Sequence, residues 1–348
     1  MVCESGRVDV ALQMLDLLAR RYAFAEVAAL VADGVCTGRR SDDQIAEIEQ
    51  LCAFGDRLIA LDAEDFGNPD AAAGANTEHA MADRITGDAV PASLVARALK
   101  CRMPQSASEP DRGALGSLRP AFRLLLEVIT VRWTRRETSA LVAALHIASE
   151  YLPMLAWEPV LGHAGDPARM AASVGGKHSL WGQMENRECP HTRPEKSAAD
   201  RALRVANEPQ PGWRAYLDRQ HSAVSSALRV CAADCRTRCS VITRYDASTQ
   251  ERLKHACAVA EEFTSSQLIQ LRHSAPVGHG FGVPSLAQVT AAWDHTRDLI
   301  ANKEPRVRVD DGYPLPGLPS LVSALAGVDI TPDTLVADTV AALRAALR

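Results

Sequence analysis

Four of the ten histidines lie near glycines in segments predicted to turn sharply, and these are the first residues whose types could do chemistry. They are His163, His178, His273 and His279. A glycine beside a histidine lets a ligand or a metal approach the backbone closely, because glycine has no side chain to obstruct it. The alternative is that each is an ordinary solvated or hydrogen-bonded surface histidine, as loops commonly carry.

The segment from Gly278 to Ser285, Gly-His-Gly-Phe-Gly-Val-Pro-Ser, is the most distinctive in the chain. Its three alternating glycines are unsuited to the interior of a helix, and Ser285 is a cap for the helix that follows. Such a loop between two long helices can close over a bound molecule and offer backbone N–H groups to a carboxylate. It is not a nucleotide fingerprint, because no strand precedes it and the Walker lysine is missing. The alternative is a tight helix–helix turn that binds nothing.

Three cysteines, Cys231, Cys235 and Cys239, are spaced by four on one helix predicted over 213–239. Three thiols on one helix face could bind a metal, since thiolates are soft ligands. A closed structural zinc site takes four ligands, however, and its usual cysteine spacings are shorter. We therefore interpret these cysteines as a stripe facing the core, where a free cysteine behaves as a small hydrophobic residue.

The chain that positions these residues is predicted to be all-α. Of its 348 residues, 47% are hydrophobic but only 5% are aromatic, and Ala and Leu, the strongest helix formers, carry the apolar fraction. Apolar residues recur with helical periodicity, most densely over 118–131 and 137–155, with a further long helix predicted over 248–272. The predicted architecture is a multi-helix bundle with one large helical domain.

Three regions are predicted along the chain. Residues 1–66 form an N-terminal helical segment, whose second helix begins at the cap residue Ser41. Residues 67–116 form a loop-rich linker with one short helix, because Gly, Ala, Asn and Asp crowd its first half. Residues 117–348 form the main helical domain, which holds the candidate active site.

Composition argues against several classes of partner. The net charge of -5 provides no basic face for phosphates, so nucleic acid is not expected as a partner. No stretch reaches the roughly 18 apolar residues that a membrane-spanning helix needs, so no membrane is expected either. The polar start of the chain, with Glu4 before any apolar run, argues against a signal peptide. The nine cysteines are then expected to be thiols in a reducing cytoplasm.

A long late helix bearing His255 and His273, followed by the glycine loop of 278–286, resembles the tryptophan 2,3-dioxygenase superfamily. Its relatives include the ring-rearranging enzyme of the pyrrolnitrin pathway and the heme-dependent tyrosine hydroxylases of antibiotic biosynthesis. The resemblance covers about the last third of the chain, together with its general helicity. In that superfamily a histidine on a late helix binds heme iron, and a glycine loop covers an aromatic amino acid.

The resemblance implies a heme b cofactor whose iron is bound by His273, or else by His255. The other face of the iron would stay open to oxygen or peroxide. A catalytic histidine is implied on that face, His163 first and His146 second, to take a proton from a phenol or a peroxide. The heme would supply the oxidising chemistry, and the protein would supply orientation and a dry pocket.

The implied function is heme-dependent oxidation of an aromatic amino acid, such as tyrosine or a derivative, in antibiotic biosynthesis. The implied substrate-binding residues are Arg272, Gly278, His279, Gly280 and Phe281. Arg272 or the loop N–H groups would hold the substrate carboxylate, and a homodimer is kept open as the assembly. Two alternatives stay open: a non-catalytic helical ligand-binding or regulatory protein whose glycine loop is a hinge, and a helical non-heme metal enzyme that uses histidines and carboxylates.

Overall fold

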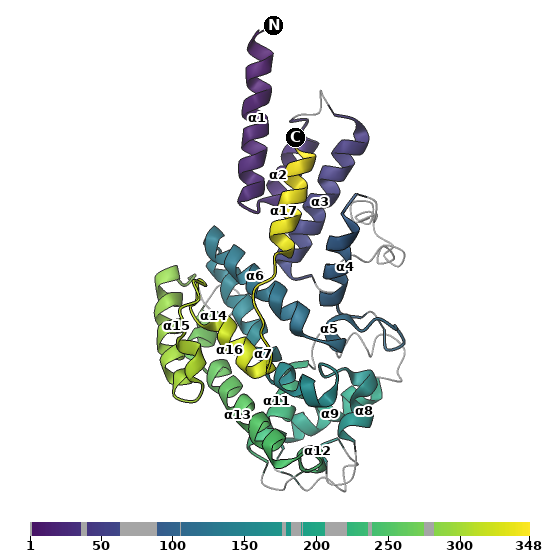
Figure 1. Cartoon of the computed structure of the whole chain (residues 1–348), viewed down its shortest axis with the longest axis vertical. Coiled ribbons are helices and arrows are strands. Elements are labelled where there is room, and N and C mark those ends of the chain that lie inside the picture. The colour runs from purple at the N-terminus through teal and green to yellow at the C-terminus, as the bar shows by residue number, and fades with distance from the viewer. Residues whose placement is uncertain are drawn as a thin grey trace. The chain divides into compact units, whose positions relative to one another are not determined.

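The computed structural model describes residues 2–35, 40–62, 89–104, 106–175, 179–181, 189, 191–205, 221–235, 239–274 and 282–348. Every regular element in these ranges is a helix, and none of the ranges contains a strand (Figure 1). The predicted all-α, multi-helix fold is therefore confirmed. The chain divides into two compact units, one combining Met1–Met103 with Asp333–Arg348 and the other comprising Pro104–Pro332.

The first unit is built from helices at both ends of the sequence. Their bounds are Val2–Arg20 for α1, Phe24–Ala32 for α2, Asp42–Ala60 for α3, Ala92–Cys101 for α4 and Leu335–Ala346 for α17. Helix α3 begins as predicted at Ser41, whose hydroxyl accepts the Gln44 N–H in a reciprocal capping box. Helix α17 packs against α3 and α4 (Figure 1). The last helix thus belongs to the first unit, whereas the sequence placed all of 117–348 in one domain.

An ion-pair cluster fastens α17 within this unit. The Arg97 guanidinium on α4 donates to Asp333 at 2.5 Å and to Asp338 at 2.6 Å. Of the linker predicted over 67–116, residues 67–88 and 105 lie outside the described residues, and α4 is a short helix within the rest.

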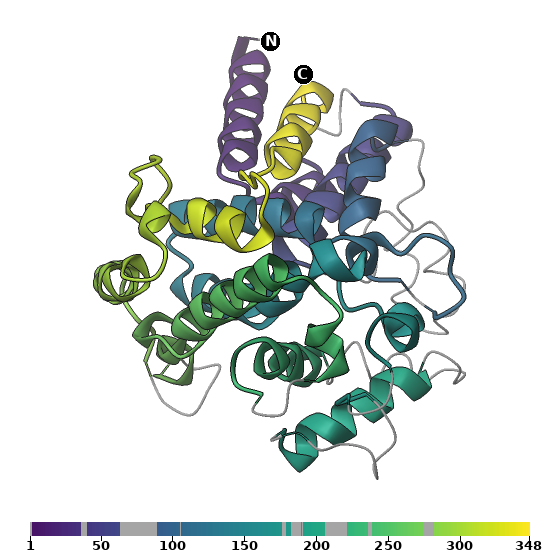
Figure 2. The same cartoon turned by 60° about the horizontal axis from the view of Figure 1, so that its bottom comes forward.

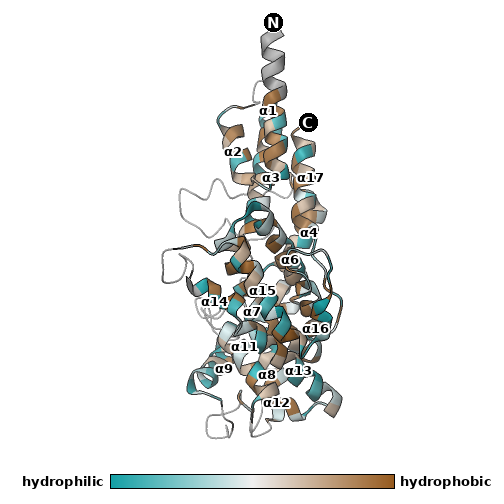
Figure 3. Cartoon of the chain, turned by 90° about the vertical axis from the view of Figure 1, so that its left-hand side faces the viewer, coloured by the Kyte–Doolittle hydropathy of each residue, from teal (hydrophilic) through white to brown (hydrophobic). Residues whose placement is uncertain are grey.

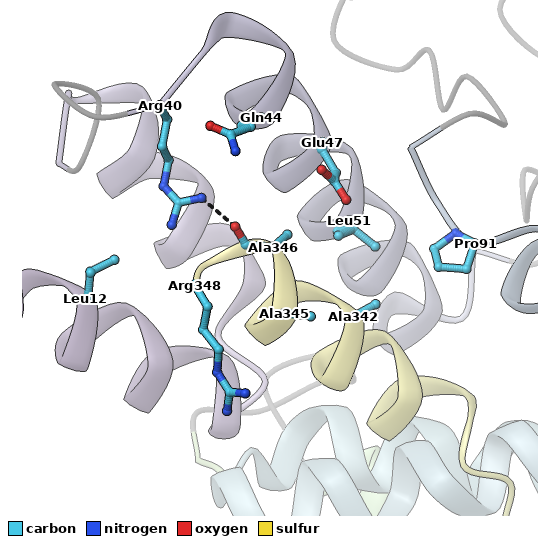
Figure 4. A pocket seen from close by; sticks show the side chains of 10 residues that line it. All are labelled: Leu12, Arg40, Gln44, Glu47, Leu51, Pro91, Ala342, Ala345, Ala346 and Arg348. Carbon is cyan, nitrogen blue, oxygen red and sulfur yellow. Dashed lines mark hydrogen bonds between the residues drawn. The ribbon is translucent and has the colours of Figure 1, made fainter.

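A groove of about 600 Å³ opens in the first unit among α1, α3 and α17 (Figure 4). Two arginines and one glutamate line it, together with apolar side chains such as Leu12 and Leu51. The Arg40 side chain crosses the groove to donate to the Ala346 carbonyl at 2.5 Å (Figure 4). No histidine or cysteine lines this groove among the described residues.

The second unit is a larger helical body. The bounds of its helices are Gly113–Gly116 (α5), Arg119–Arg135 (α6), Thr138–Leu161 (α7), Pro167–Val174 (α8), Arg193–Val205 (α9), His221–Ala233 (α11), Ser240–Thr243 (α12), Ala247–Thr264 (α13), Gln267–Ser274 (α14), Leu286–Ala301 (α15), Pro305–Arg308 (the 3-10 helix η5) and Leu318–Ala326 (α16). Hydrophobic and hydrophilic residues are interspersed along these helices, as in amphipathic helices (Figure 3).

Helix α7 is the centre of this unit, as the apolar density over 137–155 predicted. It contacts α6, α11, α13, α14 and α16 (Figure 2). Trp157 is fully buried, and its indole N–H donates to the Leu228 carbonyl on α11 at 3.1 Å. By length and composition, α7 alone among the described helices could cross a membrane, yet 61% of its apolar window is buried within the protein. Such burial is also typical of a core helix.

Two long helices predicted from periodicity are broken in the structure. The helix predicted over 213–239 is described as α11, which ends at Ala233, and α12, which begins at Ser240. The helix predicted over 248–272 divides into α13 and α14. At the second break the hydroxyls of Thr264 and Ser265 bond back to carbonyls four residues earlier, at 2.9 and 2.7 Å. Hydroxyls that bond to the backbone in this way compete with continuation of a helix.

Candidate metal centre

His163, predicted as a catalytic histidine, is a buried residue in the turn between α7 and α8. Its Nδ1 accepts the Asp166 backbone N–H at 3.0 Å, and its Nε2 lies 3.0 Å from the Ser173 hydroxyl. Only 2% of the residue is exposed, and burial lowers its pKa to about 4. Both ring nitrogens have partners within the protein, so the ring is held as a neutral hydrogen-bonding group.

The same turn contains a buried ion pair. Arg112 Nε and Nη2 donate to the two oxygens of Asp166, each at 2.8 Å, and both side chains are almost fully buried. Arg112 also donates to the carbonyls of Ser106 and Glu109. Paired, bidentate geometry of this kind is what allows charges to be buried.

Of two other predicted site residues, His146 contacts Glu150, and Arg272 acts on the same carboxylate through its charge. His146 Nε2 and His221 Nε2 each lie 3.4 Å from one oxygen of the Glu150 carboxylate. Tyr151 stacks on the His221 ring, with centroids 4.6 Å apart. Burial acts to raise the pKa of Glu150, but the His221 hydrogen bond and the charges of both histidines and Arg272 lower it overall.

No described contact connects the two proposed heme ligands, His255 and His273, with the group around Glu150. His255 on α13 is half-exposed, and its Nε2 lies 3.5 Å from a Glu304 oxygen that Arg306 also binds. The backbone of His273 belongs to α14, but its side chain lies outside the described residues. Gly278, His279, Gly280 and Phe281 lie outside them as well, so heme binding and loop closure stay predictions.

A different set of residues forms a compact donor cluster in the second unit. One ligand atom from each of Cys189, His191, Cys235 and Cys239 lies within 4.8 Å of all the others. We call these four residues the Cys3His cluster. His191 and Cys239 are buried, while Cys189 and Cys235 are partly exposed.

Three short segments position the Cys3His cluster. Cys189 and His191 precede α9, where Thr192 and Glu195 form a reciprocal cap with contacts of 2.9 and 3.4 Å. Cys235 follows the end of α11, and its N–H donates to the Val230 carbonyl at 2.9 Å. Cys239 is the extended residue before α12, and its carbonyl accepts the N–H groups of Ile242 and Thr243.

The imidazole of His191 is oriented as a metal ligand requires. Its Nδ1 lies 2.7 Å from Cys189 Sγ, and its Nε2 lies 3.3 Å from the Ala227 carbonyl on α11. A ligating histidine commonly gives its second N–H to a backbone carbonyl, which fixes the tautomer and the ring orientation. Burial lowers the pKa of His191 and so favours the neutral imidazole that a metal needs.

Sulfur chemistry in the cluster centres on Cys239. Its pKa is lowered to about 6, because the thiols of Cys231, Cys235 and Cys189 and the Leu180 N–H hydrogen-bond its sulfur. Burial and donation to Cys239 raise the pKa of Cys235 to about 12. These hydrogen bonds favour the thiolate of Cys239, the form in which cysteine binds metals, whereas they favour the protonated form of Cys235.

The donor set and its spacing fit one tetrahedral ion. Zn–S bonds of about 2.3 Å at tetrahedral angles place two sulfurs about 3.8 Å apart. Cys235 Sγ and Cys239 Sγ are 3.2 Å apart, so a small outward adjustment would admit the ion. A multi-iron cluster would hold its cysteines further apart, because several iron and sulfide atoms lie between them.

The interpretation of the cysteines as a stripe on one helix is therefore wrong. The chain leaves the α-helix after Ala233, so Cys235 and Cys239 are held by turns and not by a helix face. The other two donors of the cluster, Cys189 and His191, precede Cys235 by more than 40 residues, and only the tertiary fold brings them close to it. A possible signal was the Cys-x-His pair at 189–191, which lies apart from the predicted helices.

Comparison with protein-family models, with curated proteins and with solved structures finds no match to this chain.

Proposed function

We propose that this protein binds one zinc ion through the Cys3His cluster, and that the ion clamps three segments of the second unit together. The observation that carries the proposal is the convergence of four ligand atoms within 4.8 Å. These donors come from segments more than 40 residues apart in sequence, so their convergence is a property of the fold.

The chemistry of the donors supports zinc over other common ions. Magnesium and calcium take oxygen ligands, and no carboxylate belongs to the cluster. Three thiolates and one imidazole form a standard tetrahedral set for zinc, which has no geometric preference of its own to satisfy. The Lys196 ammonium, which donates to the Cys189 carbonyl at 3.1 Å, offsets the net negative charge of three thiolates around a divalent cation.

Four protein ligands favour a structural role for the ion. A catalytic zinc keeps one position for water or substrate, whereas four protein donors fill a tetrahedral shell. The ion would join the start of α9 to the end of α11 and the start of α12. Such a link stabilises the folded state directly, because the site does not exist in the unfolded chain.

Heme-dependent oxidation of an aromatic amino acid stays a prediction from the sequence resemblance. Its proposed ligand His273 and its glycine loop lie outside the described residues, and His255 faces Glu304. No described contact favours that function over metal binding.

Metal analysis of the purified full chain tests the proposal. We expect about one zinc per chain by elemental mass spectrometry, and Cys239→Ser should lose most of it. Cys52→Ala is the matched control, because Cys52 is a buried cysteine of the first unit, remote in sequence from the cluster. Equal zinc content in Cys239→Ser and the control would overturn the proposal.

A further inference from the structure

Three large apolar side chains form an exposed stripe along α1 in the first unit. Val10, Met14 and Leu17 are 61%, 49% and 55% exposed. Their spacings of four and three residues place them on one face of the helix. Leu15 and Ala19, on the other side of α1, are fully buried, so this helix has a second apolar face that meets solvent. We call Val10, Met14 and Leu17 the α1 stripe.

The α1 stripe differs from the other exposed apolar residues of the chain. Three of the eight exposed large apolar side chains among the described residues lie within these eight positions of α1. The other five are spread over the second unit, at least ten residues apart in sequence. Single exposed apolar residues are normal on a protein surface, whereas a contiguous stripe marks a surface that contacts another molecule.

The pattern of the α1 stripe suits another helix as its partner. Apolar residues at positions i, i+4 and i+7 are those through which one helix contacts another. The start of α1 extends past the ends of α2, α3 and α17 (Figure 1). A helix end without packing partners is only marginally stable in water. A second helix beside α1 would therefore stabilise this end as well as cover the stripe.

The charges along α1 favour a second copy of the same helix as that partner. The sequence places Glu4 and Asp9 in the first half of α1, and Arg20 and Arg21 at its end. Arg20 pairs with Asp16 of its own helix, whereas Arg21 is exposed. In an antiparallel pair, the acidic residues of each helix lie near the basic end of the other.

We infer that the chain forms a two-fold homodimer in which the α1 stripes of two copies pack against each other as antiparallel helices. A register centred near residue 12 sets Val10 opposite Met14 of the second copy. It also sets Glu4 beside Arg21 of the second copy. A register centred on Met14 is disfavoured, because it would set Arg7 opposite Arg21. The two-fold axis makes every such contact occur twice, and none of them involves the Cys3His cluster.

Analytical ultracentrifugation of the purified full chain at about 100 µM tests the dimer. We expect a mass twice the 37.4 kDa of one chain. Leu17→Glu should weaken dimerisation by more than about 100-fold, because each copy would then bring an unpaired charge into the interface. Leu299→Glu is the matched control, since Leu299 is a 40% exposed leucine on α15 of the second unit. It should dimerise as the unaltered chain does.

Two results would overturn the inference. One is the mass of a single chain for the unaltered protein at about 100 µM. The other is equal dimerisation by Leu17→Glu and Leu299→Glu, which would place the interface away from the α1 stripe.

A charge exchange tests the antiparallel pairing without altering the α1 stripe. Glu4→Arg and Arg21→Glu should each weaken the dimer by about 10-fold, because each sets like charges side by side in both symmetry-related contacts. The double variant should recover the affinity of the unaltered chain to within about 3-fold, since unlike charges meet again. A double variant that dimerises no more tightly than either single variant would overturn the antiparallel pairing.

Discussion

The buried histidine at the α7–α8 turn should make the second unit sensitive to mild acid. His163 has its ring nitrogens engaged by the Asp166 N–H and the Ser173 hydroxyl. A proton added to Nδ1 would point at the Asp166 N–H, which is itself a donor, and would place a positive charge in a buried site. Burial accordingly lowers its pKa to about 4 in the folded protein, from the usual value of 6.5.

The sign and size of the effect follow from proton linkage. Below about pH 6.5 the unfolded chain takes up a proton that the folded chain refuses, so stability is lost as the pH falls from about 6.5 to about 4. Between about pH 7 and pH 5 this single group should cost about 2 kcal/mol of the free energy of unfolding. Above about pH 7 it should contribute no pH dependence.

The perturbation is His163→Asn, whose side-chain oxygen can still accept the Asp166 N–H but cannot titrate. At about pH 7 the variant should be less stable than the unaltered chain by about 1–3 kcal/mol, for lost packing and the lost Ser173 contact. That gap should narrow by about 2 kcal/mol at about pH 5, because only the unaltered chain meets the cost of the proton. Other titrating groups are common to both proteins and cancel in the difference.

Urea unfolding followed by tryptophan fluorescence provides the assay. All five tryptophans lie within Pro104–Pro332, so the signal reports on the second unit alone. A stability difference that stays constant or widens from about pH 7 to about pH 5 would contradict this assignment of the pH dependence to His163. It would show that protonated His163 is accommodated in the fold.

Two further predictions concern residues that hold the second unit. Arg112→Met should lower its free energy of unfolding by about 3–5 kcal/mol in the same urea assay, because it leaves the buried Asp166 carboxylate with only the more distant Arg169 guanidinium, 3.6 Å away, as an ion-pair partner; a loss under about 1 kcal/mol would show that Arg169 or water replaces the Arg112 guanidinium. Gly317→Ala should be strongly destabilising, because φ is +84° there and the new Cβ would lie 1.8 Å from the Val307 carbonyl oxygen. Gly327→Ala is its control, since φ is +69° but nothing lies within 4 Å; it should cost only about 1–2 kcal/mol, and equal melting temperatures for the two variants would contradict the steric account.

Local features of the fold were predictable from the sequence. Ser41 and Ser285 were both expected to start helices, and each forms a capping box with the glutamine three residues later. A cap depends on only four consecutive residues, so the sequence contains nearly all the information that it needs. The central position of α7 was likewise visible in its apolar density.

The metal centre was not predictable in the same way. The spacing of Cys231, Cys235 and Cys239 fits a stripe along one helix. Had α11 continued to residue 239, the three sulfurs would have shared one face of that helix. The chain instead turns after Ala233, and a distant segment supplies Cys189 and the only imidazole in the cluster. Such a site depends on tertiary contacts, which periodicity along one segment does not describe.

The roles of the candidate histidines also depend on tertiary contacts that the sequence does not show. His163 lies beside glycines, as a ligand-binding residue would, but the turn uses those glycines to bury the ring against Asp166 and Ser173. His146 was found by its type alone, and it shares its partner Glu150, also on α7, with His221 of α11. Whether a histidine binds a ligand or completes a hydrogen-bond network therefore depends on the elements packed around it.

The most direct test of the central claim is X-ray absorption spectroscopy at the zinc edge of the purified, zinc-loaded chain. We expect four neighbours of the zinc ion, of which three are sulfurs at about 2.3 Å and one is a nitrogen at about 2.0–2.1 Å. A Cys239→Ser sample measured in parallel should lose sulfur scattering together with bound zinc. A zinc shell made only of oxygen and nitrogen in the unaltered chain would place the ion elsewhere and would contradict the account.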